Sequence, residues 1–331
     1  MERKAAQRIP KWKVNARTQV HNLAKDKRIK IDDLPFQWDE LFFNIGPITA
    51  ELRLIDGVTP RPEDLAKITF YVPRYMYGAA ALAPIAKMSS LKVIQSPNAG
   101  VDDVIPLRPT GVTLCNAAGV HDASTAELAV GLAIAARRGF AKFAQDQSAG
   151  KWSHQTFAAL TDSKIAIVGH GNIGKTISRM LAGFEVEITS FSRSGAAGSL
   201  TIDKFDQLID TFDVIILIVP LNEQTRHLMN SARLAAMKDG AALVNVARGP
   251  IVDTDALVAE LNAGRICAGL DVTDPEPLPT GHPLWRAPNT FITPHVGGDS
   301  KAFEPRGRAL IEAQLARFAA GQPLVNVVAE G

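Results

Sequence analysis

Short apolar runs alternate with helix-like amphipathic stretches from about residue 28 onward. Strands alternating with helices are typical of parallel α/β sheets. A first set of strands is predicted at residues 50–55, 69–72, 91–95 and 112–115, with a helix opening at 62–66. A second set is predicted at residues 164–168, 186–191, 214–219, 242–246 and 268–272. The second set is almost continuously apolar, which indicates strands buried on both faces, as in doubly wound parallel sheets.

A long helix is expected between the two sets of strands. The run Ser124-Thr125-Ala126-Glu127 fits a capping box, in which the serine and glutamate side chains satisfy free backbone N–H groups at a helix start. Arg137-Arg138-Gly139 fits the other end, because cations and glycine favour a helix C-terminus. A last helix is predicted at residues 303–320, closed by Gly321.

Length and composition narrow the class of protein. The chain has 331 residues, above the size at which a single core usually stops growing, so two domains are expected. Its formal net charge of +2 argues against a nucleic-acid partner, and no apolar run is long enough to span a membrane. Cys115 and Cys267 lie in apolar stretches without zinc spacing, which predicts core residues, no metal site and a reducing, cytoplasmic location. Residues 1–27 form a basic extension that lacks the apolar segment of a signal peptide.

A glycine-rich turn follows the predicted strand at 164–168. It consists of Gly169, His170, Gly171, Asn172, Ile173 and Gly174. This spacing suits a dinucleotide site, in which backbone N–H groups at a helix N-terminus face a pyrophosphate. With Lys175 and Thr176 it also matches the phosphate-binding loop of ATPases. An ATPase needs a strand ending in an acid to hold magnesium, and the next two strands end in Ser192 and Pro220, so the dinucleotide interpretation is favoured.

The residues after the predicted strand at 186–191 bear on the choice of cofactor. NAD sites usually carry an acid there, which binds the ribose 2′-hydroxyl. This chain has Ser192, Arg193 and Ser194. A carboxylate would repel a 2′-phosphate, whereas a guanidinium and hydroxyls bind one. The sequence therefore predicts NADP(H) rather than NAD(H), with a polar surface turn as the alternative.

Three further strand ends offer a guanidinium, a carboxylate and an imidazole, at Arg248, Glu276 and His295. Reduction of a 2-oxo acid needs a cation for the substrate carboxylate and carbonyl, and a proton donor active near neutral pH. A carboxylate beside the histidine would favour its protonated form and fix its orientation. Taken singly, each residue also fits an ordinary role, as a salt bridge, a surface acid or a capped turn.

In these motifs and their order, residues 28–331 resemble the D-isomer-specific 2-hydroxyacid dehydrogenase family. The shared segments are GHGNIG at 169–174, VPLNEQTRHLMN at 219–230, VNVARGPIVD at 244–253, GLDVTDPEPLP at 269–279 and TPHVGG at 293–298. The resemblance implies that His295 donates a proton to the substrate carbonyl, that Arg248 binds and polarises the 2-oxo acid, and that Glu276 supports His295. It implies a substrate site formed by Val72, Asn98, Ala99, Gly100, Arg248 and His295. It adds to the glycine turn and Ser192–Ser194 the cofactor contacts Thr125, Val219, Pro220, Thr225, Val246, Ala247, Asp271, His295 and Gly297.

The resemblance also implies a domain organisation. A flavodoxin-like substrate-binding domain would comprise residues 1–118 and 297–331, and a Rossmann dinucleotide-binding domain residues 119–296, with a cleft between them. Family members are usually homodimers, and residues 121–155 are the expected interface.

Departures within the family favour one branch of it. Ser192-Arg193 resembles the NADP-using glyoxylate and hydroxypyruvate reductases. Ala99 stands where phosphite dehydrogenases have lysine, and Glu276 where formate dehydrogenases have glutamine. The expected activity is therefore NADPH-dependent reduction of a small 2-oxo acid to the D-2-hydroxy acid. The alternative is a dinucleotide-sensing interaction protein, like the corepressors that share this fold.

Overall fold

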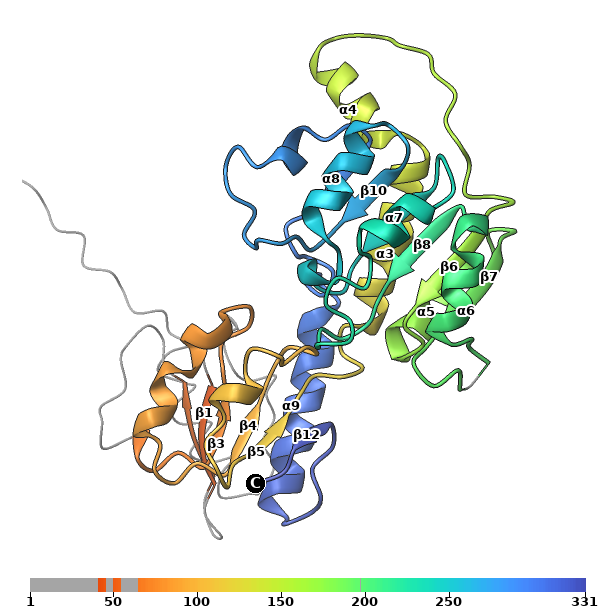
Figure 1. The fold of residues 1–331 in the computed structure, drawn as a ribbon. Coiled ribbons are helices and arrows are strands. Elements are labelled where there is room, and N and C mark those ends of the chain that lie inside the picture. The colour runs from red at the N-terminus through yellow and green to blue at the C-terminus, as the bar shows by residue number, and fades with distance from the viewer. Residues whose placement is uncertain (1–40, 46–49, 55–64, 197) are drawn as a thin grey trace, which may run out of the picture. The chain divides into compact units, whose positions relative to one another are not determined.

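The computed structural model describes residues 41–45, 50–54, 65–196 and 198–331, and contacts divide the chain into two units (Figure 1). Unit 1 comprises residues 1–120 and 304–331, and unit 2 residues 121–303. The basic extension at 1–27 and most of the helix start expected at 62–66 lie outside the described residues. Within the described part of the chain, no helix is long and apolar enough to cross a membrane.

Unit 1 contains one mixed sheet in the order β12-β5-β4-β3-β1-β2. The three central strands are parallel, as predicted, whereas β1 runs antiparallel to β2 and β3, and β12 antiparallel to β5. The strands are β1 (Leu41–Ile45), β2 (Ala50–Leu54), β3 (Phe70–Val72), β4 (Val93–Gln95), β5 (Thr113–Cys115) and β12 (Val327–Ala329). The sequence did not predict β1 or β12.

Helices cover both faces of this sheet. Successive strand residues point to opposite faces, so Phe70 and Tyr71 face different partners. Tyr71 belongs to a buried cluster with residues of the 3-10 helix η2 (Gly78–Lys87). Phe70 meets Phe318 of α9 (Phe303–Ala319), with ring centroids 5.4 Å apart. A short 3-10 helix, η3 (Ile105–Leu107), precedes β5.

Unit 2 is built on a fully parallel sheet in the order β11-β10-β9-β8-β6-β7. The strands are β6 (Lys164–Val168), β7 (Glu187–Phe191), β8 (Val214–Leu217), β9 (Ala242–Asn245), β10 (Cys267–Leu270) and β11 (Thr290–Ile292). Every residue of β8 and β9 is buried. This burial confirms the doubly wound α/β sheet predicted from their apolar sequences.

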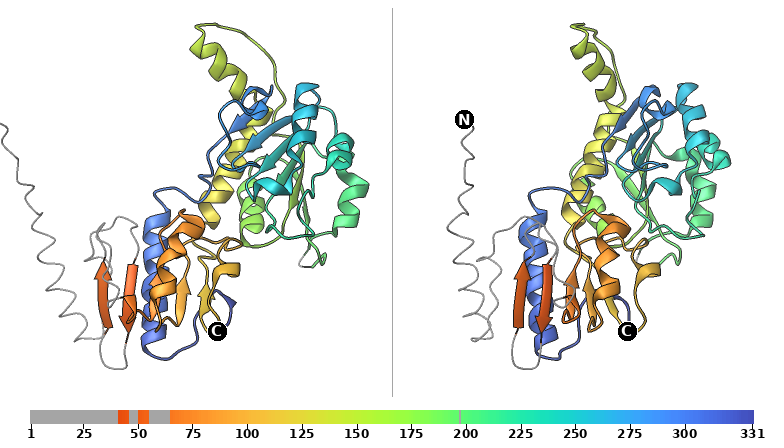
Figure 2. Two further views of the ribbon diagram at one scale, coloured as in Figure 1. Left: turned by 60° about the vertical axis from the view of Figure 1, so that its left-hand side comes forward. Right: turned by 90° about the vertical axis from the view of Figure 1, so that its left-hand side faces the viewer.

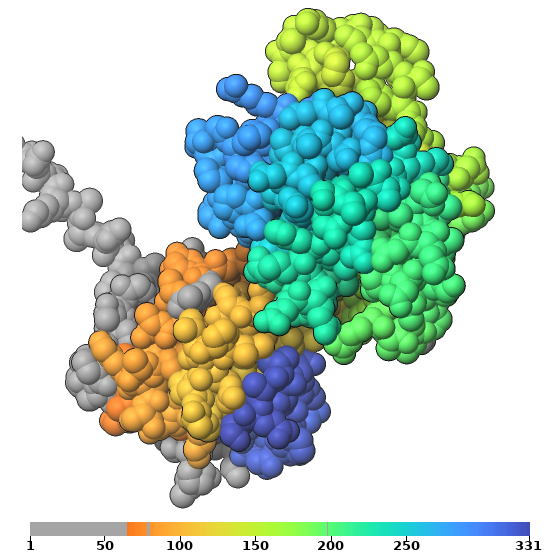
Figure 3. Space-filling model, in the orientation of Figure 1, coloured from red at the N-terminus to blue at the C-terminus, as the bar shows by residue number. Residues whose placement is uncertain are grey.

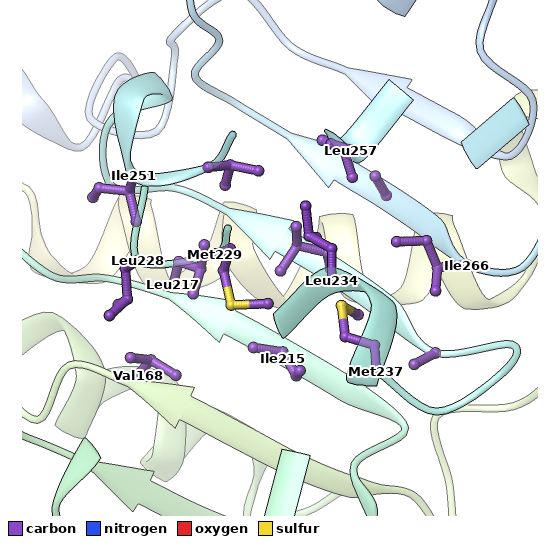
Figure 4. Close-up of a cluster of buried hydrophobic side chains, with 14 of the residues drawn as sticks. Val168, Ile215, Leu217, Leu228, Met229, Leu234, Met237, Ile251, Leu257 and Ile266 are labelled. Atoms are coloured by element: carbon purple, nitrogen blue, oxygen red, sulfur yellow. The ribbon is translucent and has the colours of Figure 1, made fainter. Parts of the chain in front are cut away.

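The helices of unit 2 pack against the two faces of the sheet through clusters of buried apolar side chains. One face packs against α3 (Asp122–Arg137) and α5 (Asn172–Leu181), and α3 lies so close to β10 that a Cβ on Gly269 would be 2.9 Å from Leu132. The opposite cluster, drawn in Figure 4, packs against α6 (Ile202–Leu208), α7 (Ser231–Ala236) and α8 (Thr254–Asn262). The 3-10 helices of this unit are η4 (Ile209–Thr211), η5 (Gly249–Ile251) and η6 (Pro283–Arg286).

The start of α3 differs from the prediction. The helix begins at Asp122, two residues before the predicted cap, and no side chain caps it. Ser124 instead lies within the first turn, and its hydroxyl is 2.7 Å from that of Ser300. The predicted capping box is wrong, because Ser124 lies inside the helix and its hydroxyl contacts Ser300 instead of the helix start. The predicted end is confirmed, since the helix stops at Arg137 and Gly139 follows with a φ of 66°.

An arm projects from unit 2 after α3. It consists of α4 (Phe140–Ser148) and the extended segment that follows, and both ribbon views show it standing clear of the sheet (Figure 2). In the space-filling view its yellow-green atoms form a lobe at the top of this unit (Figure 3). Apolar side chains are exposed along it, with Phe140 47% and Trp152 99% accessible.

Candidate active site

The glycine turn joins β6 to α5 and is shaped by close backbone contacts. Gly169 has a φ of 122°, and a Cβ there would lie 2.2 Å from the carbonyl oxygen of Ile218. A Cβ on Gly174 would lie 2.0 Å from the carbonyl oxygen of Gly169. These two glycines are therefore required by the fold itself, because any other residue would force the strand and helix apart.

Gly171 differs from its two neighbours. It precedes α5, it lies outside the left-handed region, and a Cβ there would meet nothing within 4 Å. Packing within the protein does not explain this glycine. The open space before the N-terminus of α5 fits a phosphate group that approaches the backbone of residues 171–174, where the amides and the positive end of the helix dipole favour an anion. His170 is half-buried beside this space in the turn.

The loop after β7 returns to the strand and is closed by hydroxyl groups. Ser192 accepts a hydrogen bond from the backbone N–H of Gly195 at 3.1 Å, and its hydroxyl is 2.7 Å from that of buried Ser199. Arg193 and Ser194 are exposed on this loop. The loop therefore presents a guanidinium and one exposed hydroxyl, while Ser192 serves largely to shape it.

Arg248 lies on a turn formed at the end of β9. Asn245, 1% exposed, holds this turn by accepting from the N–H of Ala247 at 3.1 Å and donating to the carbonyl of Arg248 at 2.9 Å. The guanidinium of Arg248 donates to the carbonyl of Ala247 at 2.7 Å. Val246 and Ala247 are buried beneath it. No role was predicted for Asn245, although an asparagine at a buried strand end suggests such a turn.

Glu276 and His295 form a direct pair. The Nδ1 of His295 lies 2.5 Å from Oε1 of Glu276, and their side chains are 28% and 39% exposed. With Nδ1 engaged by the carboxylate, the other ring nitrogen, Nε2, is the one left to exchange a proton with a ligand. The structure thus brings together two members of the predicted trio.

Asp271 fixes the turn that carries His295. It is 3% exposed, and its carboxylate accepts hydrogen bonds from the hydroxyl of Thr293 at 2.6 Å and from the amides of Val296 and Gly297 at 2.8 Å each. His295 itself has a φ of 55°, a left-handed conformation that a non-glycine residue adopts only when its surroundings impose it. The carboxylate of Asp271 supplies that constraint.

Asp271 also lies beside two other predicted cofactor residues. A Cβ on Gly297 would lie 2.9 Å from Oδ2 of Asp271 and 3.4 Å from Cγ2 of Thr125 on α3. The structure therefore brings Thr125, Asp271 and Gly297 together.

Val219, Pro220 and Thr225 lie in the segment after β8. Thr225 donates to the carbonyl of Pro220 at 2.6 Å and accepts from the amide of Asn222 at 2.8 Å. Within the described structure, the side chain of Thr225 therefore closes this turn. Val219 and Pro220 belong to the turn that Thr225 closes.

The remaining predicted substrate residues lie in unit 1, after two neighbouring parallel strands. Val72 is the last residue of β3, and Asn98, Ala99 and Gly100 follow β4. The amide of Asn98 donates to the hydroxyl of Ser96 at 3.1 Å, and its carbonyl accepts from Ala117 at 2.9 Å. The side chain of Asn116 donates to the carbonyl of Ala99 at 2.7 Å, so this loop is held in a defined shape.

The other reactive groups of the described residues do not form a further centre. No group of three or more histidine, cysteine, aspartate and glutamate side chains could hold a metal ion in the part of the chain that the structure describes. Burial raises the pKa of the thiols of Cys115 and Cys267 to about 11 in each case.

Known proteins resemble this chain in sequence and in fold. The model of the D-isomer specific 2-hydroxyacid dehydrogenase NAD binding domain matches residues 130–297. A hydroxypyruvate reductase of Thermotoga maritima is 34% identical over 67% of this chain and 76% of the relative. A glyoxylate reductase of Thermofilum pendens is 34% identical over 66% of this chain and 68% of the relative. The crystal structure of a D-isomer specific 2-hydroxyacid dehydrogenase of Xanthobacter autotrophicus, in complex with NADPH and MES, has a TM-score of 0.68 at 27% identity, covering 84% of this chain and 88% of that one.

Proposed function

Because this chain belongs to the D-isomer specific 2-hydroxyacid dehydrogenase family, an oxidoreductase family, we propose that it uses NADPH to reduce glyoxylate, hydroxypyruvate or a similar small 2-oxo acid to the D-2-hydroxy acid. The observation that carries this proposal is the pair formed by His295 and Glu276, 2.5 Å apart, in the same unit as the glycine turn. A histidine held in this way by a carboxylate suits the proton transfer that accompanies reduction of a carbonyl.

In the proposed mechanism, His295 donates the proton from Nε2 to the carbonyl oxygen of the substrate, which becomes the hydroxyl group. Glu276 accepts a hydrogen bond at Nδ1 and keeps the ring oriented throughout. Arg248 binds the substrate carboxylate and polarises its carbonyl with a charge that is already in place. A dinucleotide held by the glycine turn at residues 169–174 would supply the hydride for the carbonyl carbon.

The remaining predicted residues divide between the two units. The backbone at Asn98, Ala99 and Gly100, with Val72 beside it, would hold the substrate carboxylate, which makes unit 1 the substrate-binding domain. Unit 2 would bind the dinucleotide through residues 169–174, with Thr125, Asp271 and Gly297 beside the nicotinamide. The open space at Gly171 supports this placement of the pyrophosphate.

The choice of NADPH rests on the loop after β7. Arg193 and Ser194 are its exposed donors for a 2′-phosphate, and no carboxylate occurs among residues 192–200 to repel one. Arg193→Ala should therefore lower kcat/KM for NADPH with little effect on NADH. Arg138→Ala, which removes an exposed arginine at the end of α3, is the matched control. A wild-type preference for NADH, or an Arg193→Ala enzyme with unchanged NADPH kinetics, would overturn this choice.

We also propose that the protein is a homodimer formed through the arm and the helix before it, residues 121–155. The exposed Phe140 and Trp152 support this, because apolar side chains gathered on a projecting segment are typical of an interface. Sedimentation equilibrium should show a dimer for the wild type and a monomer for the Phe140→Ser/Trp152→Ser double variant. A monomeric wild type would refute the proposal.

The activity is tested by following NADPH oxidation with a panel of 2-oxo acids. His295→Gln should lower kcat by about 10²- to 10⁴-fold, the usual contribution of general acid catalysis. His154→Gln, a matched change at an exposed histidine of the arm, should leave kcat unchanged. If the wild type binds NADPH but reduces none of the acids, a dinucleotide-sensing protein of the same fold becomes the better description.

A further inference from the structure

The turn that carries Arg248 and the loop that carries Glu276 are in direct backbone contact. A Cβ on Gly249 would lie 1.9 Å from the carbonyl oxygen of Thr273 and 2.7 Å from the amide nitrogen of Asp274. No real side chain tolerates such distances, so this approach requires glycine. The two loops leave different strands, β9 and β10, and the contact lies directly after Arg248 in one loop and just before Glu276 in the other.

A side-chain hydrogen bond also joins the end of the first loop to the second. Thr254, the first residue of α8, donates its hydroxyl to the carbonyl of Asp274 at 2.9 Å. The helix start does not need this hydroxyl, because the carboxylate of Asp253 already caps it by accepting from the amide of Ala256 at 3.1 Å. The hydroxyl of Thr254 is therefore committed to a segment twenty residues further along the chain.

The acceptor lies at the base of the Glu276 loop. Asp274 precedes Glu276 by two residues, and Thr273 braces the intervening residue by donating its own hydroxyl to the carbonyl of Pro275 at 2.9 Å. Beyond this point the loop reaches Glu276, whose side chain is 39% exposed. The hydrogen bond from Thr254 thus ties the start of α8 to the loop two residues before Glu276.

We propose that Thr254 is a positioning residue, which holds the Glu276 loop against the Arg248 turn and so sets the Glu276–His295 pair in register with the guanidinium. This assignment rests on the proposed function, since it concerns the same site. Thr254 lies outside the residues proposed above to bind substrate and cofactor. Its contribution is geometric, and errors of about 1 Å in the placement of reacting groups can cost about a hundredfold in rate.

The test replaces the hydroxyl by a methyl group of similar size. Thr254→Val should lower kcat by about ten- to a hundredfold with KM for NADPH unchanged, because the cofactor contacts are untouched. Thr254→Ser, which keeps the hydroxyl, should restore most of the rate. Thr211→Val is the matched control, since Thr211 also donates to a carbonyl, that of Leu208 at 2.6 Å, on the distant helix η4.

A second readout does not depend on turnover. The ring ¹⁵N chemical shifts of His295, detected through its carbon-bound protons and assigned by their loss in His295→Gln, report the hydrogen bond at Nδ1. Glu276→Gln defines the shifts without the carboxylate. The shifts of Thr254→Val should move from the wild-type values towards those of Glu276→Gln, while Thr211→Val stays at the wild type.

The outcomes separate this inference from the proposed function. If the wild type reduces no 2-oxo acid, the proposed function fails and the ring shifts still decide the role of Thr254. Wild-type shifts and kcat in Thr254→Val would overturn the inference. Should the valine prevent folding, Thr254→Ala removes the hydroxyl without adding a methyl group and is judged by the same two measurements.

Discussion

The replacement Asp271→Asn tests the hydrogen bonds that hold the His295 turn. The carboxylate accepts two bonds at Oδ1, from Thr293 and Val296, and one at Oδ2, from Gly297. Asparagine has the same shape but replaces one oxygen by an NH₂ group, which can only donate. In either orientation of the amide, a backbone N–H faces another donor in a site that is 3% exposed.

The expected cost follows from these contacts. One buried amide loses its partner, which costs about 1–3 kcal/mol. The bonds that remain are no longer assisted by charge, which roughly halves their strength. Relief from burying a charge offsets part of the loss, so the free energy of unfolding should fall by about 2–4 kcal/mol. Thr293→Val removes one hydroxyl and leaves the carboxylate bound by both amides, so it should cost about 1 kcal/mol.

Urea unfolding at neutral pH, followed by circular dichroism and tryptophan fluorescence, measures this series. The transition that belongs to unit 2 is the one to compare, because the chain contains two units. The expected order of stability is wild type, Thr293→Val, then Asp271→Asn. An Asp271→Asn protein within about 0.5 kcal/mol of the wild type would refute the reasoning, since so small a loss is that of an ordinary surface substitution.

Three further predictions concern other parts of the described structure. Gly171→Ala should leave the urea midpoint unchanged, because nothing lies within 4 Å of the added Cβ, yet weaken NADPH binding in a fluorescence titration by about tenfold or more; equal affinity would show that no ligand approaches this backbone. The hydrogen bond from Arg233 lowers the pKa of Asp206, so their pair stabilises the fold fully above the unfolded carboxyl pKa of about 4, and this contribution is lost as the pH falls through the lowered folded pKa. Asp206→Asn should therefore lower the free energy of unfolding at pH 7 by less than about 1 kcal/mol, because the side chain is 46% exposed, and by a smaller amount at pH 3. With pKa values of about 11, the thiols of buried Cys115 and half-buried Cys267 should react with a thiol reagent at pH 8 much more slowly in the native than in the unfolded protein, and equally rapid labelling of both states would contradict this.

The sequence predicted the buried parallel strands well, and also β2 and β7 at the sheet edges, but it missed β1 and β12. β8 and β9 are buried on both faces, so their continuous apolar runs were enough to predict them as strands. β12 is three residues long, and Val327 and Val328 in it are 38% and 41% exposed. Its pairing with β5 joins segments more than 200 residues apart. Local pattern cannot predict such a strand, because the partner alone decides it.

The site divides in a similar way. The identities of Arg248, Glu276 and His295 came from motifs at strand ends, where parallel sheets place their polar groups. The contacts by which those loops hold one another could not be predicted in this way, because they depend on one glycine and one threonine, and both residue types are common in loops. Gly249 matters only when the carbonyl of Thr273 is known to lie where its Cβ would be. Thr254 matters only when its acceptor, twenty residues away, is known.

Asp271 shows why a residue's role needs its contacts as well as its position. The family resemblance implied that Asp271 contacts the cofactor, and the proposed function puts it beside the nicotinamide, whose carboxamide carries N–H donors. An ionised carboxylate offers about four acceptor positions. In the structure the turn of residues 293–297 fills three of them. A carboxamide N–H would find one position left, on the same group that imposes the left-handed backbone of His295. A substitution at Asp271 that weakens cofactor binding must therefore also disturb the proton donor, so effects on KM for NADPH and on kcat should appear together.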